Sequence, residues 1–444
     1  MSRFLLLALL LNLLAVPTLA HDDHAPPKVL DDDLYRATPM PDRIILTWKG
    51  DPAHSQAVTW RTDGSIKQGL AEIAEATPGP DFAKNPKQLT ASTEPFESNL
   101  GLAHYHSLDF TELKPATKYA YRVGDGTNWS EWFQFTTASD QPDAFSFIYF
   151  GDAQTQVRSH WSRVIREAHS DAPKARFMIH AGDLVNNGTR DAEWGEWFGA
   201  GGWLNAMVPS VPTPGNHEYA RDPERPLLRR DLTAHWRPQF TLPENGIEGL
   251  EESVYYLDYQ GVRIISLNSN EKEREQAPWL ESVLQDNPNR WTVLTFHHPV
   301  YSTAKGRDNP DIRNMWKPIF DKYRVDLVLQ GHDHGYGRFS GELSENVGTG
   351  QNTQSPEGGT VYVVSVSGPK MYNVERTPAM ARAAENTQLY QIISIDGDAL
   401  RYEARTATGE LYDAFRLKKK PGERNELVDE IPETPERLGI LKKE

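Results

Sequence analysis

Five short polar blocks, each containing Asp, Asn or His, could do chemistry in this chain. They lie at residues 151–154, 182–186, 215–218, 297–299 and 331–334. Carboxylate and amide oxygens and imidazole nitrogens suit Zn, Fe, Mn and similar ions. One such block is ordinarily a turn, a cap or a surface loop. Five blocks in sequence order instead predict a site for two metal ions.

Four of the blocks follow short apolar runs that are typical of buried strands, at 145–150, 177–180, 291–296 and 328–330. Helix-like stretches separate several such runs, at 158–168, 277–284 and 312–323. Buried strands that alternate with helices predict an α/β domain. Ligand sites of such domains form at the carboxyl ends of the strands, so we expect the blocks to lie together. Glycine before Asp152, Asp183 and His332 lets the backbone turn sharply beside the ligand.

The chain before this domain has a different pattern. Residues 42–138 contain several short runs rich in β-branched and aromatic residues, separated by Gly and Pro turns, which predict an all-β sandwich. Residues 113–119 resemble the approach to a late tyrosine strand in fibronectin type III domains. This segment gathers no catalytic groups, which favours a structural or docking module.

The remaining segments complete the predicted organisation. Residues 1–20 have the pattern of a signal peptide cleaved near Ala20, which predicts a secreted or periplasmic protein. Residues 21–41 form an N-terminal arm, 143–415 the catalytic domain and 416–444 a charged C-terminal tail. The chain has no cysteine, so thiolate chemistry is excluded, and its net charge of −15 argues against nucleic acid as a partner. No later segment is apolar for long enough to span a membrane.

Taken in order, the blocks resemble the pattern Asp, Gly-Asp, Gly-Asn-His-Glu, His, Gly-His-x-His of the calcineurin-like metallophosphoesterases, in particular the purple acid phosphatases. The resemblance covers residues 145–413 and extends to the N-terminal domain. It implies a fibronectin type III-like sandwich followed by an α/β (α-β-β-α) metallophosphoesterase domain.

The resemblance also implies a role for each polar residue. Asp183 would bridge the two ions, which would be Fe, Zn or Mn. The remaining ligands would be Asp152 and His334 for the first ion, and Asn216, His297 and His332 for the second. His217 would be a general acid or hold the phosphoryl group, and Glu218 would orient a ligand or His217. His298 would contact substrate or pack under the strand end, and Arg338 would contact phosphate or form a structural salt bridge.

Two positions depart from the family pattern. Asn186 stands where purple acid phosphatases carry the tyrosine whose phenolate on Fe(III) gives their colour. Gln154 stands where a neighbouring branch carries histidine. A neutral amide is a weaker ligand than a phenolate or an imidazole, and Gln154 could equally hydrogen-bond to water beside the ion. We therefore expect a colourless protein with a weaker first site.

The function implied is that of a secreted dinuclear metallophosphatase. Two ions about 3.5–4 Å apart would activate a water, whose hydroxide attacks the phosphorus of a small phosphate monoester. One alternative is a phosphodiesterase or nucleotide hydrolase with the same site. A second, of a different class, is an adhesion or binding protein with a structural metal site. The oligomeric state is left open.

Overall fold

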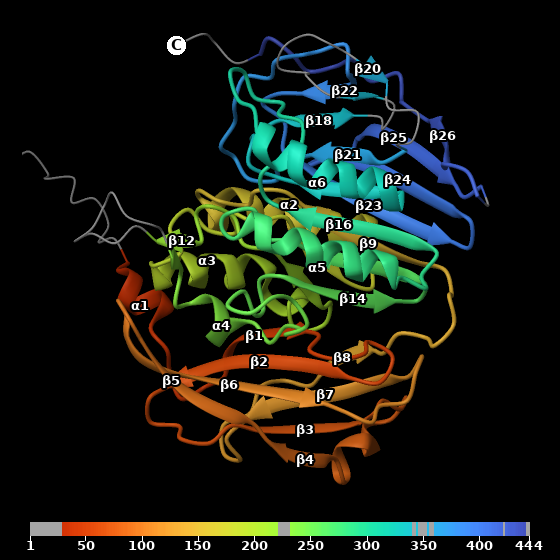
Figure 1. The fold of residues 1–444 in the computed structure, drawn as a ribbon. Coiled ribbons are helices and arrows are strands. Elements are labelled where there is room, and N and C mark those ends of the chain that lie inside the picture. The colour runs from red at the N-terminus through yellow and green to blue at the C-terminus, as the bar shows by residue number, and fades with distance from the viewer. Residues whose placement is uncertain are drawn as a thin grey trace, which may run out of the picture.

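Two antiparallel four-stranded sheets pack face to face in the N-terminal domain of the computed structural model, drawn in red and orange in Figure 1. The first sheet has the order β1-β2-β6-β5, with bounds Asp42–Thr47, Gln56–Asp63, Gly101–Phe110 and Ser92–Ser98. The second has the order β4-β3-β7-β8, with bounds Lys87–Thr90, Leu70–Glu75, Lys118–Gly124 and Phe133–Thr136. Trp60 of one sheet and Tyr121 of the other are fully buried in the shared core. The predicted sandwich is confirmed.

The structure describes residues 29–220, 231–339, 343–344, 353–354, 359–420 and 422–440. The predicted signal peptide, residues 1–20, lies outside them. None of the helices in these ranges has both the length and the apolar character that crossing a membrane requires.

Two seven-stranded sheets face one another in the second domain and share one hydrophobic core (Figure 1). One sheet has the order β11-β10-β9-β23-β24-β25-β26, with bounds Ser210–Pro212, Met178–His180, Phe145–Phe150, Leu389–Asp396, Ala399–Thr406, Leu411–Lys418 and Glu426–Asp429. The other has the order β14-β15-β16-β17-β21-β18-β22, with bounds Tyr255–Tyr259, Val262–Ser266, Trp291–Phe296, Leu327–Gln330, Val361–Val364, Tyr336–Phe339 and Met380–Ala384.

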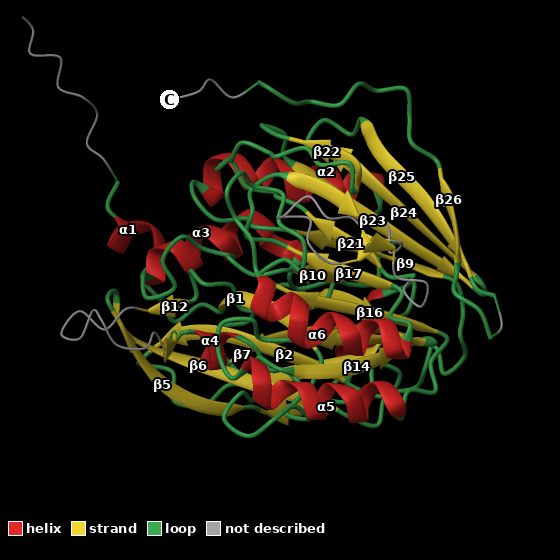
Figure 2. Cartoon of the chain, turned by 45° about the horizontal axis from the view of Figure 1, so that its top comes forward, coloured by secondary structure: helices red, strands yellow, loops and turns green. Residues whose placement is uncertain are grey.

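Helices cover the outer faces of both sheets (Figure 2). Helices α2 (Ser162–Asp171) and α3 (Asp191–Gly201) pack on the first sheet, while α5 (Glu273–Gln285) and α6 (Pro310–Tyr323) pack on the second. The apolar stripe of α6 places Trp316 and Phe320 against Phe296. This layering is the α-β-β-α arrangement that the sequence predicted.

Shorter elements complete the fold. They are α1 (Asp31–Tyr35), α4 (Trp236–Gln239), the 3₁₀ turns Pro80–Lys84 and Gly202–Leu204, the π-helical turn Val157–Trp161, and the strand pairs β12 (Tyr219–Ala220) with β13 (Asp231–Leu232) and β19 (Leu343–Ser344) with β20 (Thr353–Gln354). Helix α1 belongs to the predicted N-terminal arm and contacts α3. Within the predicted charged tail, β26 pairs with β25, so that segment extends the first sheet.

Two contacts join the two domains: a buried cluster of charged residues, and a tryptophan of the sandwich that packs into the core of the second domain. Arg43 and Arg61 of the sandwich each place a guanidinium nitrogen 2.8 Å from a carboxylate oxygen of Asp191 in α3. Trp48 packs with Phe177 and Tyr259 in the core of the second domain. Both features hold the sandwich in a fixed position beside the sheets.

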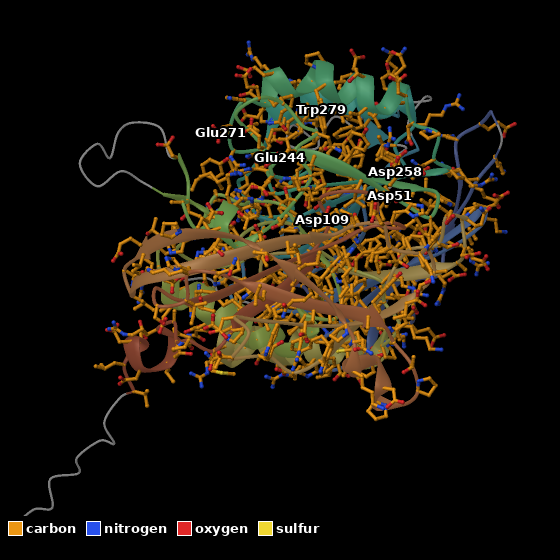
Figure 3. The ribbon with its side chains drawn as sticks, turned by 90° about the horizontal axis from the view of Figure 1, so that it is seen from below. Asp51, Asp109, Glu244, Asp258, Glu271 and Trp279 are labelled. Carbon is orange, nitrogen blue, oxygen red and sulfur yellow. The ribbon has the colours of Figure 1, made fainter. Side chains whose placement is uncertain are left out.

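Figure 3 labels acidic side chains of both domains in a view from below. Asp51 and Asp109 belong to the sandwich, and Glu244, Asp258 and Glu271 to the second domain. Burial raises the pKa of Asp109 to about 6, although Lys49 opposes this.

Candidate metal centre

The five polar blocks follow strands whose carboxyl ends point to one edge of the two sheets. Strands β9, β10 and β11 run parallel, and in their register His180 lies beside both Phe150 and Pro212. Strands β16 and β17 are also parallel and pair Phe296 with Gln330. Since each block follows directly after its strand, the parallel register brings all five together.

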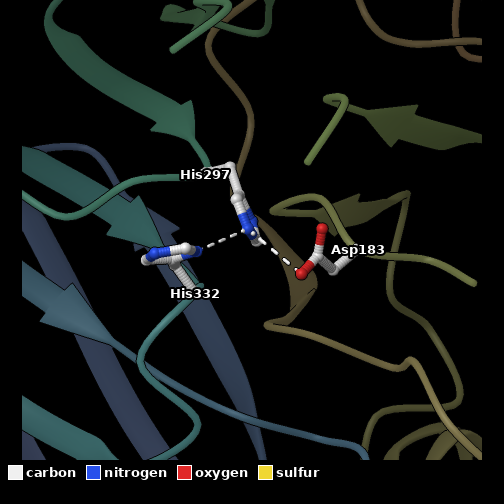
Figure 4. A group of neighbouring side chains, drawn as sticks. All are labelled: Asp183, His297 and His332. Carbon is white, nitrogen blue, oxygen red and sulfur yellow. Dashed lines mark hydrogen bonds and ion pairs between the residues drawn. The ribbon is translucent and has the colours of Figure 1, made fainter. Parts of the chain in front are cut away.

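One group of donors consists of Asp183, His297 and His332 (Figure 4). The Nε2 of His297 lies 3.2 Å from Oδ2 of Asp183 and 3.1 Å from Nδ1 of His332. The Oδ1 of Asn216 joins them at 3.1 Å from His297 Nε2 and 2.9 Å from His332 Nδ1. The ligand set predicted for the second ion therefore lies around one point.

A second group consists of Asp152, Asp183 and His334, all buried. The Nε2 of His334 lies 3.0 Å from Oδ2 of Asp152. Gln154 is also buried, and its Nε2 donates to Asp183 Oδ2 at 2.7 Å and to His334 Nε2 at 2.9 Å. Asp183 thus belongs to both groups, as the bridging role requires.

Electrostatics at this centre favour a positive charge. Burial alone would lower the pKa of His297, but the carboxylates of Asp183 and Asp152 raise it to about 10. Burial alone would likewise raise the pKa of Asp183, but the charge of His297 leaves it below its ordinary value. The carboxylates of Asp183 and Asp152, which favour the protonated form of His297, also attract metal cations.

Backbone groups and Glu218 fix the orientation of the donors. The fully buried carboxylate of Glu218 accepts hydrogen bonds from the backbone nitrogens of Asp183 and Gly215, at 2.9 and 2.7 Å, and from those of Leu184 and Val185. The Nδ1 of His297 contacts the Ala181 carbonyl at 3.0 Å, which directs Nε2 inward. Glu218 therefore fixes the loop that carries Asp183.

Gly331 allows two of the loops to approach one another. A methyl group at this position would lie 2.2 Å from Oδ1 of Asp152, which also accepts a hydrogen bond from the His332 backbone nitrogen at 2.9 Å. We expect Gly331→Ala to displace Asp152 and reduce the metal content of the purified protein to below two ions per chain. Elemental analysis measures this content. Gly199→Ala is the control, because its methyl group would meet open space. Equal metal content in both variants would contradict this interpretation.

The two predicted catalytic histidines occupy different surroundings. His217 is partly exposed, with Nδ1 on the Asn186 carbonyl and Nε2 3.9 Å from Asp183 Oδ2. His298 places Nδ1 2.9 Å from the Ser269 hydroxyl and packs its ring 4.3 Å from that of His332. Burial, followed by the charge of His297, lowers the pKa of His298 to about 3. His298 is thus neutral, and its contact with substrate stays a prediction.

The structure corrects the prediction that Arg338 binds substrate. Arg338 is fully buried, and its guanidinium donates to both carboxylate oxygens of Asp413, at 2.7 and 3.1 Å, and to Asp429 at 2.8 Å. Its side chain, like that of Tyr336, points from β18 to Asp413 on β25 in the other sheet. The structural salt bridge considered from the sequence is therefore its role.

Asn186, which replaces the tyrosine of the family pattern, is exposed, and its Oδ1 accepts a hydrogen bond from Thr155 at 3.4 Å.

Sequence reasoning missed two residues at the centre. Asp333 stands between two predicted ligands, and its buried carboxylate accepts hydrogen bonds from the backbone of Thr303 and Ala304. Tyr372 stacks on His334, with ring centroids 4.4 Å apart. The position of Asp333 within the last block could have indicated it, whereas Tyr372 carries no such signal.

Comparison with known proteins gives two family matches. Residues 41–137 match the model for the purple acid phosphatase N-terminal domain. Residues 145–336 match the model for calcineurin-like phosphoesterases.

Individual relatives are distant. A phosphoenolpyruvate phosphatase of Allium cepa is 25% identical over 321 residues, 67% of this chain and 63% of that protein. The Fe(3+)-Zn(2+) purple acid phosphatase 12 of Arabidopsis thaliana is 24% identical over 334 residues, 70% of this chain and 68% of that protein. The chain spans 63–64% of the length of the first curated relatives that it matches.

A solved structure shares the fold. Purple acid phosphatase PPD1 from yellow lupin seeds superposes with a TM-score of 0.71 at 20% identity, over 85% of this chain and 74% of that one.

Proposed function

We propose that this chain, which matches the calcineurin-like phosphoesterases over residues 145–336 and the purple acid phosphatase N-terminal domain over residues 41–137, hydrolyses phosphate monoesters at a centre of two metal ions. The observation that supports this most is that two groups of donors share Asp183. Sites with two metal ions clamp the attacking and leaving oxygens of an in-line displacement, and a shared carboxylate is the feature that holds two ions close together.

The donors fit metal cations by their chemistry. The buried Oδ2 of Asp152 has no hydrogen-bond partner among the described residues, and it faces Nε2 of His334 at 3.0 Å. His334 Nδ1 lies 2.9 Å from the carbonyl of Lys370, which makes Nδ1 the donor and Nε2 an acceptor. Two acceptors this close repel one another unless a cation lies between them, so Asp152, Asp183 and His334 would hold one ion. Asp183, Asn216, His297 and His332 would hold the other.

Metal ions in these positions would supply Lewis acidity, lowering the pKa of water and neutralising phosphate oxygens. The protein's own groups do the rest. The backbone carbonyl of Asn186 accepts a hydrogen bond from Nδ1 of His217, so that Nε2 is directed to the centre. As water oxygen forms a bond to phosphorus and the bond to the leaving oxygen breaks, the imidazolium form of His217, which carries a proton on both ring nitrogens, gives its Nε2 proton to that oxygen and becomes neutral. The proton lost by water goes to solvent.

Fe, Zn and Mn are the metals we propose, since carboxylate, amide and imidazole donors suit all three. One relative is named as a Fe(3+)-Zn(2+) enzyme. With the exposed Asn186 in place of a phenolate ligand, metal-loaded protein should show no visible charge-transfer band. An absorption spectrum of the pure protein checks this, and a visible band would contradict it.

Gln154 makes the first site the weaker one in this proposal. In the present orientation of its amide, Nε2 donates to two presumed ligands, while Oε1 is buried without a partner among the described residues. We expect Gln154→His to tighten binding of the first ion by about 10- to 100-fold, the scale on which neighbouring groups tune a metal site. Competition against a chelator measures this affinity. The second ion, followed in the same titration, is the control. An unchanged first affinity would contradict this role of Gln154.

The experiment that tests the function compares p-nitrophenyl phosphate with bis(p-nitrophenyl) phosphate on one metal-analysed sample. We expect the higher kcat/KM for the monoester. A diester rate well above the monoester rate would favour a phosphodiesterase. Inactivity toward both with Fe, Zn and Mn, together with intact binding of a surface partner, would favour an adhesion protein with a structural metal site.

We also propose that the protein is exported, on the signal-peptide pattern of residues 1–20. Expression of the whole chain in a bacterium tests this. The N-terminus of the exported form should begin at His21. Protein retained in the cytoplasm with residues 1–20 intact would contradict export.

A further inference from the structure

A pocket with basic residues in its lining lies beside the segment that carries His332 and His334. It measures about 330 Å³ and is lined by Ala304, Lys305, Arg307, Tyr372 and Asn373. Its residues come from the loop after β16 and from the segment before β22, which are far apart in the sequence.

Two contacts connect this pocket to the metal ligands. The ring of Tyr372 stacks on His334, with an interplanar angle of 22°. The guanidinium carbon of Arg307 lies 4.6 Å from the centre of the Tyr372 ring, and its Nη1 donates to the His332 carbonyl at 3.3 Å. Tyr372 and Arg307 therefore line the pocket and also contact the segment that carries His332 and His334.

The loop that carries the basic residues is fixed in place. Asp333 accepts hydrogen bonds from the backbone nitrogens of Thr303 and Ala304, at 2.7 and 3.2 Å. The backbone nitrogen of Lys305 donates to the Asn373 carbonyl at 3.0 Å, and Ala304 forms a β-bridge with Val374. A loop held in this way loses little freedom when a ligand binds.

The protein neutralises the positive charge of the pocket only in part. Asp333 pairs with Arg307, and a carboxylate oxygen of Glu375 accepts a hydrogen bond from the Gly306 backbone nitrogen at 3.3 Å. The exposed side chain of Lys305 has no partner among the described residues. Arg307 is 37% exposed, and its Nη1 lies 3.5 Å from the buried carboxylate of Asp333. Lys370 adds a third cation, 5.7 Å from the Tyr372 ring. Such a group is unusual in a chain of net charge −15 and would attract an anion.

We propose that this pocket binds a second anionic group of the substrate, a phosphate or a carboxylate, through Lys305 and Arg307. The preferred substrates are then phosphate monoesters that carry a further anionic group close to the ester. Because Tyr372 already contacts His334 and Arg307, an anion fits the pocket better than a stacked aromatic base. This inference rests on the proposed function of the centre.

Matched substrates and variants test the pocket. Phenyl phosphate has one anionic group, 3-carboxyphenyl phosphate adds a carboxylate, and inorganic pyrophosphate adds a phosphate. For each two-anion substrate, the quantity measured is its kcat/KM divided by that for phenyl phosphate. We expect Lys305→Gln/Arg307→Gln to lower this ratio at least tenfold. Arg166→Gln/Lys174→Gln removes the same charge from exposed positions elsewhere and should leave the ratio unchanged.

The two substrates distinguish a carboxylate from a phosphate as the second group, since the pocket could discriminate between them. A ratio that changes less than twofold for both would overturn the proposal. So would a preference for adenosine monophosphate over phenyl phosphate that survives in the Lys305/Arg307 variant, because the pocket would then bind a base.

A binding measurement separates failure of the pocket from failure of the proposed function. Calorimetry of metal-loaded protein compares methylenebisphosphonate with methylphosphonate. The protein could be inactive and still bind methylenebisphosphonate more tightly than methylphosphonate, with a preference that the Lys305/Arg307 variant loses. This result would support the anion-binding pocket and contradict the proposed hydrolytic function. If the protein is active and the variant and the control bind methylenebisphosphonate with equal affinity, only the proposal for the pocket is contradicted.

Discussion

Asp183→Asn is expected to reduce the bound metal to one ion or none and to lower phosphatase kcat/KM by at least about 100-fold. Changes to groups that only support a metal ligand already lower metal affinity or activity by about 10- to 100-fold. Asp183 is the residue common to both donor groups. Its Oδ2 faces His297 at 3.2 Å, and its Oδ1 accepts the backbone N–H of His217 at 2.9 Å. Asparagine keeps the shape and one acceptor oxygen but removes the negative charge, so both ions lose the same ligand.

Elemental analysis and monoester kinetics on the same sample measure the effect. Asp258→Asn is a matched control, because this carboxylate pairs with Arg263 in the same domain but in neither donor group. Circular dichroism shows whether each variant is folded. Two ions retained by folded Asp183→Asn, with activity near that of the wild type, would refute the bridging role.

Arg338→Met should lower the free energy of unfolding by about 3–5 kcal/mol, the cost of leaving one partner of a buried ion pair without the other. Arg338 on β18 and Asp413 on β25 belong to different sheets and are both fully buried. Tyr336 also donates to Asp413, at 2.7 Å. The pair therefore joins the two sheets, and the single variant leaves the buried carboxylate of Asp413 with the Tyr336 hydroxyl but without its cation.

The urea midpoint of unfolding measures this loss. Arg338→Met/Asp413→Leu should recover part of it, because replacing both partners leaves no unpaired charge. The KM for p-nitrophenyl phosphate should stay within about twofold, since Arg338 does not reach the centre. A variant as stable as the wild type with a strongly raised KM would restore Arg338 as a substrate contact.

Much of the site could be predicted from the sequence because it depends on local patterns. An apolar run that ends at Gly-Asp or Gly-His specifies a buried strand and a sharp turn, and parallel strands bring those turns to one edge. The methyl group that would strike Asp152 shows why Gly331 is required. The predicted donors Asp152, Asp183, Asn216, His297, His332 and His334 lie together for this reason.

The rest depends on pairing between distant segments. Arg338 lies four residues after His334, yet its partner Asp413 is 75 residues further along the chain, so only the fold shows the direction of its side chain. Helix α3 contains Gly195, Gly199 and Gly201, which are poor helix formers, and tertiary packing overrides that preference. Strand β5 has no buried residue and contains Pro95, so no apolar alternation marks it.

Stepwise return of metal to chelator-treated protein tests the central claim most directly. p-Nitrophenyl phosphate hydrolysis is followed as Zn or Mn is added, with bound metal measured at each step. The shared Asp183 and the two donor groups predict that activity saturates at two ions per chain, the second-site ion binding first and the ion beside Gln154 last. Full activity at one ion per chain, or no activity at two, would contradict a dinuclear phosphatase.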